Sequence, residues 1–234
     1  MFNLYVMATP IGNLEDVSAR ALRILKEVDL ILCEDTRTTK KLLTRYQINR
    51  LTISYHQHSR LTKIKYILEQ LKRGQDLALV SEAGTPGISD PGAKLINYLV
   101  DQLPDLKVIP IPGPSALISA LSISGLSADK FVFLGFPPAK KKRKKFFEEV
   151  VQAKYTVVFY ESPHRILKTL EELSFVIANS VKDGAKQSCP LVVCRELTKK
   201  FETIYRGQIE EIIDQIKKDK IKGEFVVIVG NRQK

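Results

Sequence analysis

Two short clusters of ionisable residues stand out because their side chains can exchange protons or bind anions. The first is Glu34-Asp35-Thr36-Arg37 and the second is Glu161-Ser162-Pro163-His164-Arg165, and each follows an apolar run directly. Carboxylates and histidine are common general bases, whereas arginine binds phosphate and carboxylate groups. Acidic side chains also favour helix N-termini. A functional site and a helix-capping cluster are therefore both open from these residues alone.

The stretch from Leu79 to Gly92 is another candidate for a functional site, distinguished by its glycines and prolines. It places three glycines, two prolines and two carboxylates behind Leu77-Ala78-Leu79-Val80, a run typical of a buried strand. Glycine lets the backbone turn sharply and approach a ligand closely. The alternative is an ordinary strand-to-helix connection that uses glycine and proline only for its geometry.

Apolar runs alternate with segments of helical periodicity, which predicts an α/β fold. The predicted strands are 4–8, 30–33, 51–55, 77–80, 107–111, 131–134, 155–160, 191–194, 204–205 and 225–229. Helices are expected between most of them, with Ser18 as an N-cap, a helix over 39–46, another that begins at Gly92, and Pro114 in the first turn of a third. We expect a domain over 1–113 with a mostly parallel sheet and one over 114–234 with a mixed sheet.

Polar or glycine-rich clusters follow strand after strand in this pattern. They are 9–14, 34–37, 81–87, 113–116, 161–165 and 195–196. Ligands of open α/β sheets bind in the crevice outside the carboxyl ends of the strands. We therefore expect these clusters to gather in one crevice.

Composition indicates a globular protein with a basic surface. The chain has 234 residues, is 44% hydrophobic and carries a net charge of +11. The apolar run 4–8 is too short for the core of a signal peptide, and no membrane span is expected, so the sequence predicts a cytoplasmic protein. Cys33, Cys189 and Cys194 have no paired spacing and are predicted to be buried free thiols.

The positive charge points to a polyanionic partner. Residues 1–112 carry 15 basic and 12 acidic side chains, whereas residues 113–234 carry 22 and 14, so the second half is the expected polyanion face. Its basic run, Lys140-Lys141-Lys142-Arg143-Lys144-Lys145, can be a solvated helix start or a contact to a phosphate backbone.

Several familiar motifs are missing from the sequence. It has no Gly-x-Gly-x-x-Gly after a strand, no Gly-x-x-x-x-Gly-Lys-Ser/Thr and no Gly-x-Ser-x-Gly. His56 and His58 form a His-x-His pair, but no third ligand of suitable spacing is near. A dinucleotide fold, a P-loop, a hydrolase triad and a metal centre are therefore not expected.

Seven sequence blocks carry a resemblance to a known family. They are Thr-Pro-Ile-Gly-Asn-Leu-Glu-Asp (9–16), Glu-Asp-Thr-Arg (34–37), Ser-Glu-Ala-Gly-Thr-Pro-Gly-Ile-Ser-Asp-Pro-Gly (81–92), Pro-Gly-Pro-Ser-Ala (112–116), Tyr-Glu-Ser-Pro-His-Arg (160–165), Cys-Arg-Glu-Leu-Thr-Lys (194–199) and Gly-Glu-Phe-Val-Val-Ile-Val (223–229). In this order they resemble the small-subunit ribosomal RNA methyltransferase I family. That family is the ribose 2′-O-methyltransferase branch of the tetrapyrrole methylase superfamily.

The resemblance implies a class III methyltransferase, in which two α/β domains hold S-adenosylmethionine (AdoMet) in the cleft between them. It also implies a homodimer, and as substrate a cytidine ribose in the decoding region of small-subunit (16S) ribosomal RNA. The implied cofactor contacts are Pro10, Ile11, Ser81, Glu82, Gly84, Thr85, Ile88, Ser115, Ala116, Tyr160, Arg195, Glu224 and Phe225. No metal is required, because the methyl group lies on a cationic sulfonium.

The methyl acceptor implied by the resemblance is a ribose hydroxyl, which is a weak nucleophile. It gains from a nearby base or from alignment alone. The candidate bases or aligners are Glu34, Asp35, Glu161 and His164, with Arg37 and Arg165 for phosphate.

Two departures from the family pattern bear on these roles. Position 82 is Glu where the family usually has Asp, and the sequence stops just after Gly230, where many members have a small C-terminal extension. Two other functions stay open, a tetrapyrrole methyltransferase of the same fold and a non-catalytic RNA-binding module.

Overall fold

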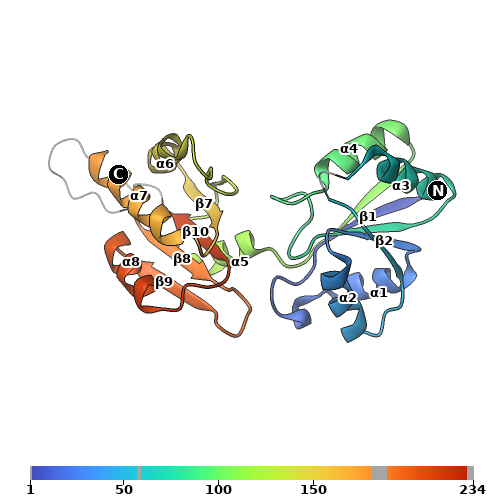
Figure 1. Cartoon of the computed structure of the whole chain (residues 1–234), viewed down its shortest axis with the longest axis horizontal. Helices are drawn as coiled ribbons and strands as arrows, with labels where there is room; N and C mark the ends of the chain where they lie inside the picture. The colour runs from blue at the N-terminus through green and yellow to red at the C-terminus, as the bar shows by residue number, and fades with distance from the viewer. Residues whose placement is uncertain (1, 57–58, 181–188, 231–234) are drawn as a thin grey trace. The chain divides into compact units, whose positions relative to one another are not determined.

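A computed structural model describes residues 2–56, 59–180 and 189–230 of the chain. The chain divides into two compact units, Met1–Ser115 and Ala116–Lys234, each with its own sheet (Figure 1). The predicted boundary, 113/114, lies two residues before this division. Together the two sheets and their helices are the α/β class that the sequence predicts.

The first unit is built on a sheet of five parallel strands. They are β1 (Asn3–Met7), β2 (Leu30–Cys33), β3 (Leu51–Ser54), β4 (Leu77–Val80) and β5 (Lys107–Ile111), in the order β3-β2-β4-β1-β5. Strands β2 and β4 are apolar and buried at every position because helices cover both faces of the sheet. Along β2, for example, Leu30 and Leu32 enter one core, whereas Ile31 and Cys33 enter the other.

Helices of the first unit pack in pairs on the two faces. The core that contains Ile31 includes residues of α1 (Ala19–Glu27) and α2 (Thr36–Arg45), and the core that contains Leu32 includes residues of α3 (Leu61–Lys72) and α4 (Ala93–Gln102). Ser18 caps α1 as predicted, since its Oγ accepts a hydrogen bond from the amide of Ala21 at 3.1 Å. A short 3-10 turn, η1 (Leu14–Asp16), precedes α1.

The second unit is built on a mixed sheet. Its strands are β6 (Phe131–Phe133), β7 (Thr156–Glu161), β8 (Leu191–Arg195), β9 (Thr203–Gly207) and β10 (Phe225–Val229), in the order β6-β7-β10-β8-β9. Only the β6–β7 pair is parallel among these neighbours. Three helices, α6 (Arg143–Gln152), α7 (Ile166–Asn179) and α8 (Ile209–Lys218), contribute to one core with β7, β8 and β10, while α5 (Ala116–Ser124) contacts β10.

Several predicted strand ends are displaced by one residue, and three further local predictions differ from the structure. Pro114 lies before the helix rather than in its first turn, because α5 begins at Ala116. Helix α2 begins at Thr36 instead of residue 39, since Asp35 caps it. Strand β9 is longer than the predicted 204–205 because it pairs with all of β8.

Two expectations about composition can be compared with the described residues. The three cysteines are free and buried, as predicted. A search of the described helices finds none that is long and apolar enough to cross a membrane.

Candidate functional site

The loops that follow β1 and β4 are joined to each other at the carboxyl edge of the first sheet. The backbone amides of Thr9 and Gly84 donate to each other's carbonyl oxygens, both at 2.9 Å. The Thr9 hydroxyl donates to the Ser81 carbonyl at 3.1 Å, and the Ser81 hydroxyl donates to the Gly84 carbonyl at 2.9 Å. Both hydroxyl groups therefore hold the loop in shape.

The loop after β5 joins the same edge. The Thr85 hydroxyl donates to the Pro114 carbonyl at 3.3 Å, and a Cβ added at Gly113 would lie only 3.1 Å from the Cβ of Ala8. Gly84 has φ +81°, a left-handed conformation that side chains other than glycine rarely adopt. Glycine at both positions thus lets the three loops approach one another closely.

Most predicted cofactor residues of the first unit lie in these three loops. Pro10, Ile11, Ser81 and Gly84 are buried, Thr85, Ser115 and the neighbouring Ala116 are half-buried, and Glu82 and Ile88 are exposed. The structure therefore brings 10–11, 81–88 and 114–115 together. Ile88, an apolar side chain, and Glu82, a carboxylate, are the exposed members of this set.

The Glu34–Arg37 cluster lies at the end of β2 and includes the cap of α2. Asp35 accepts hydrogen bonds from the Arg37 amide and guanidinium, the latter with Nη2 to Oδ2 at 2.8 Å. These bonds lower the pKa of Asp35 from 3.8 to about 2. A carboxylate with so low a pKa is a weak base, so the cap interpretation accounts for Asp35, while Glu34 is half-buried beside it.

Glu161, at the end of β7, is enclosed by hydrogen-bond donors. Its Oε1 accepts from the Ser162 amide at 2.7 Å and forms an ion pair with Arg165 Nη2 at 2.8 Å, and its Oε2 accepts from the Thr169 hydroxyl at 2.7 Å. The residue is only 1% exposed. Glu161 therefore has no path to a substrate in this conformation, whereas His164 is exposed and Arg165 is half-buried.

Arg143 is a residue whose role the sequence analysis missed. It belongs to the basic run, yet it is only 6% exposed, and its guanidinium pairs with Glu172 at 2.7 Å and donates to Thr169 at 2.8 Å. The signal was its spacing, because Arg143 precedes the buried Phe147 by one helical turn and thus shares its inward face. The other five bases of the run are exposed.

The remaining predicted residues follow β8 or begin β10. Arg195 is 8% exposed, and its Nε donates to the Lys222 carbonyl at 2.9 Å. Lys199 forms ion pairs with Glu196 at 2.8 Å and with the exposed Glu224 at 3.0 Å, and Phe225 is buried. Burial opposes ionisation of Glu196, but the hydrogen bonds from Lys199 and the Glu224 amide outweigh it and lower its pKa.

Tyr160 is half-buried between two other aromatic rings. Its ring centroid lies 4.9 Å from that of Phe133 and 5.5 Å from that of Phe136. Edge-on and tilted pairs at these separations are the favoured aromatic geometries. The three rings form an aromatic patch where β6 and β7 end.

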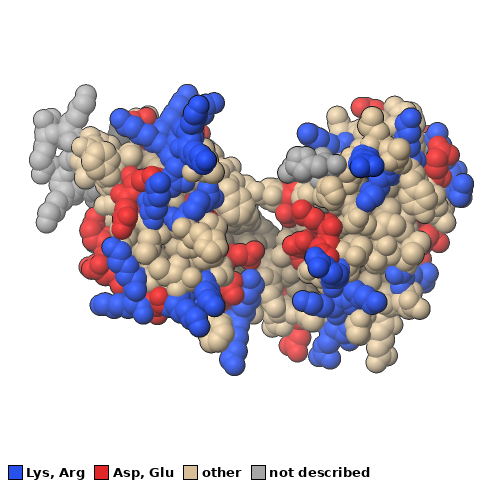
Figure 2. Space-filling view, viewed as in Figure 1, with Lys and Arg blue, Asp and Glu red and all other residues tan. Residues whose placement is uncertain are grey.

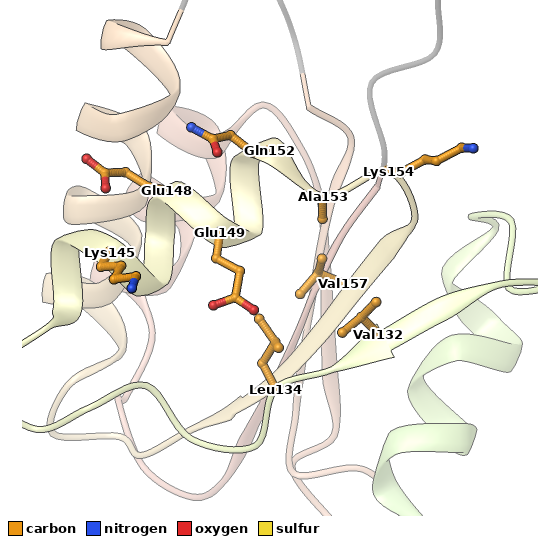
Figure 3. A pocket seen from close by; sticks show the side chains of 9 residues that line it. All are labelled: Val132, Leu134, Lys145, Glu148, Glu149, Gln152, Ala153, Lys154 and Val157. Carbon is orange, nitrogen blue, oxygen red and sulfur yellow. The ribbon is translucent and has the colours of Figure 1, made fainter.

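A separate hollow of about 520 Å³ lies between α6 and strands β6 and β7 (Figure 3). It is lined by Val132, Leu134, Lys145, Glu148, Glu149, Gln152, Ala153, Lys154 and Val157. In Figure 3 the side chain of Glu149 points towards Leu134, so carboxylates border its apolar floor. None of the predicted site residues lines this hollow.

No group of three or more His, Cys, Asp or Glu side chains that could hold a metal ion occurs among the described residues. The predicted His-x-His pair cannot be assessed as a pair, since Gln57 and His58 lie outside that part of the chain.

Comparison with solved structures defines the class of fold. A cobalt-precorrin-4 methyltransferase of cobalamin biosynthesis superposes with a TM-score of 0.70 and covers 97% of this chain and 94% of its own, at 16% sequence identity. At this identity the likeness shows the fold alone. The fold is that of the class III methyltransferases, as the sequence predicts.

Comparison of sequences then gives the family. The family model described as tetrapyrrole (corrin/porphyrin) methylases matches residues 3–213, and the chain belongs to this family. It is 46% identical over 233 residues to a ribosomal RNA small subunit methyltransferase I of Halalkalibacterium halodurans, covering 99% of this chain and 77% of that protein. It is 39% identical to the protein of the same name from Thermotoga maritima, with 100% of both chains covered. The predicted resemblance is therefore confirmed.

Proposed function

We propose that this protein transfers the methyl group of AdoMet to the 2′-hydroxyl of a cytidine ribose in the decoding region of small-subunit (16S) ribosomal RNA. The observation that carries this proposal is the 46% identity over nearly the whole chain to a protein named for small-subunit ribosomal RNA methylation. The net charge of +11 supports an RNA substrate, because lysine and arginine neutralise phosphates. The proposal includes a homodimer that works in the cytoplasm.

The loops of the first unit fit AdoMet. Its adenosine and amino-acid portions need hydrogen bonds and close backbone approach, and the loops around Thr9, Gly84 and Gly113 are held close together by their own hydrogen bonds and by two glycines. When bound, AdoMet supplies an electrophilic methyl group on a cationic sulfonium. The contacts proposed in the first unit are Pro10, Ile11, Ser81, Glu82, Gly84, Thr85, Ile88 and Ser115.

The contacts proposed in the second unit are Ala116, Tyr160, Arg195, Glu224 and Phe225. The side chains of Arg195 and Phe225 are buried within that unit. We therefore propose that they position the end of β8 and the start of β10 and make no direct polar contact with AdoMet. Tyr160 and Glu224 are the members that leave part of the side chain open to a ligand.

The proposed acceptor hydroxyl needs alignment or a base. The surroundings of the four candidate bases or aligners favour different roles for them. Asp35 caps α2 and Glu161 is enclosed, so both are proposed as positioning residues. Glu34 and His164 are proposed to touch the substrate and to align or deprotonate the hydroxyl. The exposed Arg37 is proposed to bind phosphate, whereas Arg165 holds Glu161 and the Pro137 carbonyl.

The test is methyl transfer from labelled AdoMet to three acceptors offered side by side. These are unmodified small ribosomal subunits, the naked small-subunit RNA and a uroporphyrinogen. Label on a ribose 2′-oxygen of a cytidine supports the proposal, and the two RNA arms tell whether an assembled subunit is needed. Label on the tetrapyrrole would contradict the proposal that RNA is the substrate. Absence of both methyl transfer and AdoMet binding would favour the non-catalytic RNA-binding module.

A separate measurement tests the homodimer. The molar mass in solution, measured by light scattering, is expected to be twice that of one chain. A single-chain mass at the concentrations used for the methyl-transfer assay would contradict this part of the proposal.

A further inference from the structure

The segment between β6 and α6, residues 134–142, combines an exposed aromatic ring with exposed lysines. Phe136 is 52% exposed although one side of its ring lies against Tyr160. Lys140, Lys141 and Lys142 follow it within six residues and are exposed. In the space-filling view, Lys and Arg side chains gather over the part of the second unit where α6 is drawn (Figure 2). An exposed ring beside several cations is the combination that single-stranded nucleic acids bind.

A network of hydrogen bonds and an ion pair, centred on the buried Glu161, holds the backbone of this segment in place. Two guanidinium groups donate to the carbonyl oxygens of consecutive prolines, Arg165 to Pro137 at 3.0 Å and Arg143 to Pro138 at 2.9 Å. Both arginines are linked through the buried Glu161, directly for Arg165 and through the Thr169 hydroxyl for Arg143. On the strand side, the Tyr160 amide donates to the Gly135 carbonyl at 2.8 Å. These bonds hold Gly135, Pro137 and Pro138, so the part of the segment that carries Phe136 loses little conformational freedom on binding, which favours affinity.

The lysines before the helix differ from those within it. Lys144 lies 3.8 Å from the carboxylate of Glu148, and Lys145 lines the hollow that Glu148 and Glu149 border. These carboxylates repel a phosphate backbone. A bound strand is therefore expected to follow residues 136–142 and not the exposed face of α6.

We propose that residues 135–142 form a preformed platform for unpaired RNA, on which the Phe136 ring stacks with one base while Lys140, Lys141 and Lys142 neutralise neighbouring phosphates. This inference rests on the proposed function for its choice of RNA. Stacking suits a ribose methyltransferase because a base held by its face leaves the sugar edge accessible. Because Phe136 contacts Tyr160, the stacked base lies beside a residue proposed to contact the cofactor.

The absence of tryptophan from the sequence allows a direct test. In Phe136→Trp, the single indole reports stacking, and its fluorescence is expected to be quenched by a short cytidine-containing single-stranded RNA. Phe175→Trp is the matched control, since Phe175 is 66% exposed but lies on α7, outside residues 135–142, and no quenching is expected there. Equal quenching at both positions, or none at 136, would overturn the stacking.

Two further variants separate stacking from charge. Phe136→Ala is expected to weaken single-stranded RNA binding by about tenfold. The triple change Lys140→Ala, Lys141→Ala and Lys142→Ala is expected to reduce the slope of log K against log salt by about 2, while Lys144→Ala leaves it near the wild-type value. An unchanged slope in the triple variant would overturn the phosphate contacts.

The outcome is independent of the methyl-transfer assay, because these measurements need neither AdoMet nor turnover. If ribose methylation proceeds but the indole at 136 is not quenched, the platform is wrong and the proposed function stands. If the indole is quenched and no ribosomal RNA is methylated, the proposed function fails while the platform remains.

Discussion

The Thr169 hydroxyl donates a hydrogen bond to Glu161 Oε2 at 2.7 Å, and both residues are at most 1% exposed. The same hydroxyl oxygen accepts a hydrogen bond from Arg143 Nη2 at 2.8 Å. One threonine thus joins a buried carboxylate to a buried guanidinium, and through them β7 to α6. Loss of either hydrogen bond would leave a buried polar group without its partner, which is costly.

Thr169→Val is therefore expected to destabilise the protein by about 1–3 kcal/mol, because valine has a similar shape but no hydroxyl. Thr169→Ser, which keeps the hydroxyl, is expected to lose less. Chemical denaturation followed by circular dichroism measures both. Equal stability of the valine variant and the wild type would mean that the network contributes nothing to folding.

Arg143→Ala is expected to destabilise the protein by about 2–4 kcal/mol, since it removes the hydrogen bonds to Glu172 Oε2, the Thr169 hydroxyl and the Pro138 carbonyl and leaves Glu172 with only the more distant Lys168 at 3.9 Å. Lys144→Ala, the neighbour in the same basic run, is the control. Its exposed ion pair with Glu148 predicts a change within about 0.5 kcal/mol. If the two variants have the same denaturation midpoint, the inward role assigned to Arg143 is wrong.

Asp35 is expected to make stability depend on pH under acid conditions. Its pKa is lowered to about 2 by hydrogen bonds from Arg37, whereas the ordinary value is 3.8. The folded state therefore binds the proton less readily, so the stabilisation is present above about pH 4 and is lost as the pH falls towards 2. Asp35→Asn, which keeps the cap acceptor but cannot ionise, should show a flatter dependence between pH 5 and pH 2 in thermal unfolding. Parallel curves for the two proteins would contradict this assignment.

Glu34→Ala and His164→Ala test the proposed substrate contacts. If either group acts as the general base, kcat for methyl transfer falls by about 10²–10⁴ while AdoMet affinity is unchanged, because the removed group acts on the acceptor hydroxyl. Rates within a few-fold of wild type for both variants would leave alignment of the hydroxyl as the account of catalysis. AdoMet affinity, measured by calorimetry on the same samples, confirms that each variant is folded.

Local sequence patterns were enough to predict most of the framework. Buried strands such as β2 and β4 are short apolar runs bounded by polar residues, and Ser18 precedes an amphipathic helix, so both are determined within a few residues of the chain. The same holds for the glycine-rich loop after β4, whose composition matches its left-handed turns. The family resemblance rests on these blocks, since they keep their order along the chain.

What the sequence alone determined is thus the order of strands and helices, the α/β class, the family and the loops at the strand ends. Only the tertiary structure decided that Glu161 is buried among hydrogen-bond donors and that Arg143 turns inward from a run of exposed lysines. Burial and hydrogen bonding depend on neighbours distant in the chain, such as Thr169 and Glu172 for Arg143. A residue type shows what a side chain can do, whereas its surroundings determine whether it is free to do it.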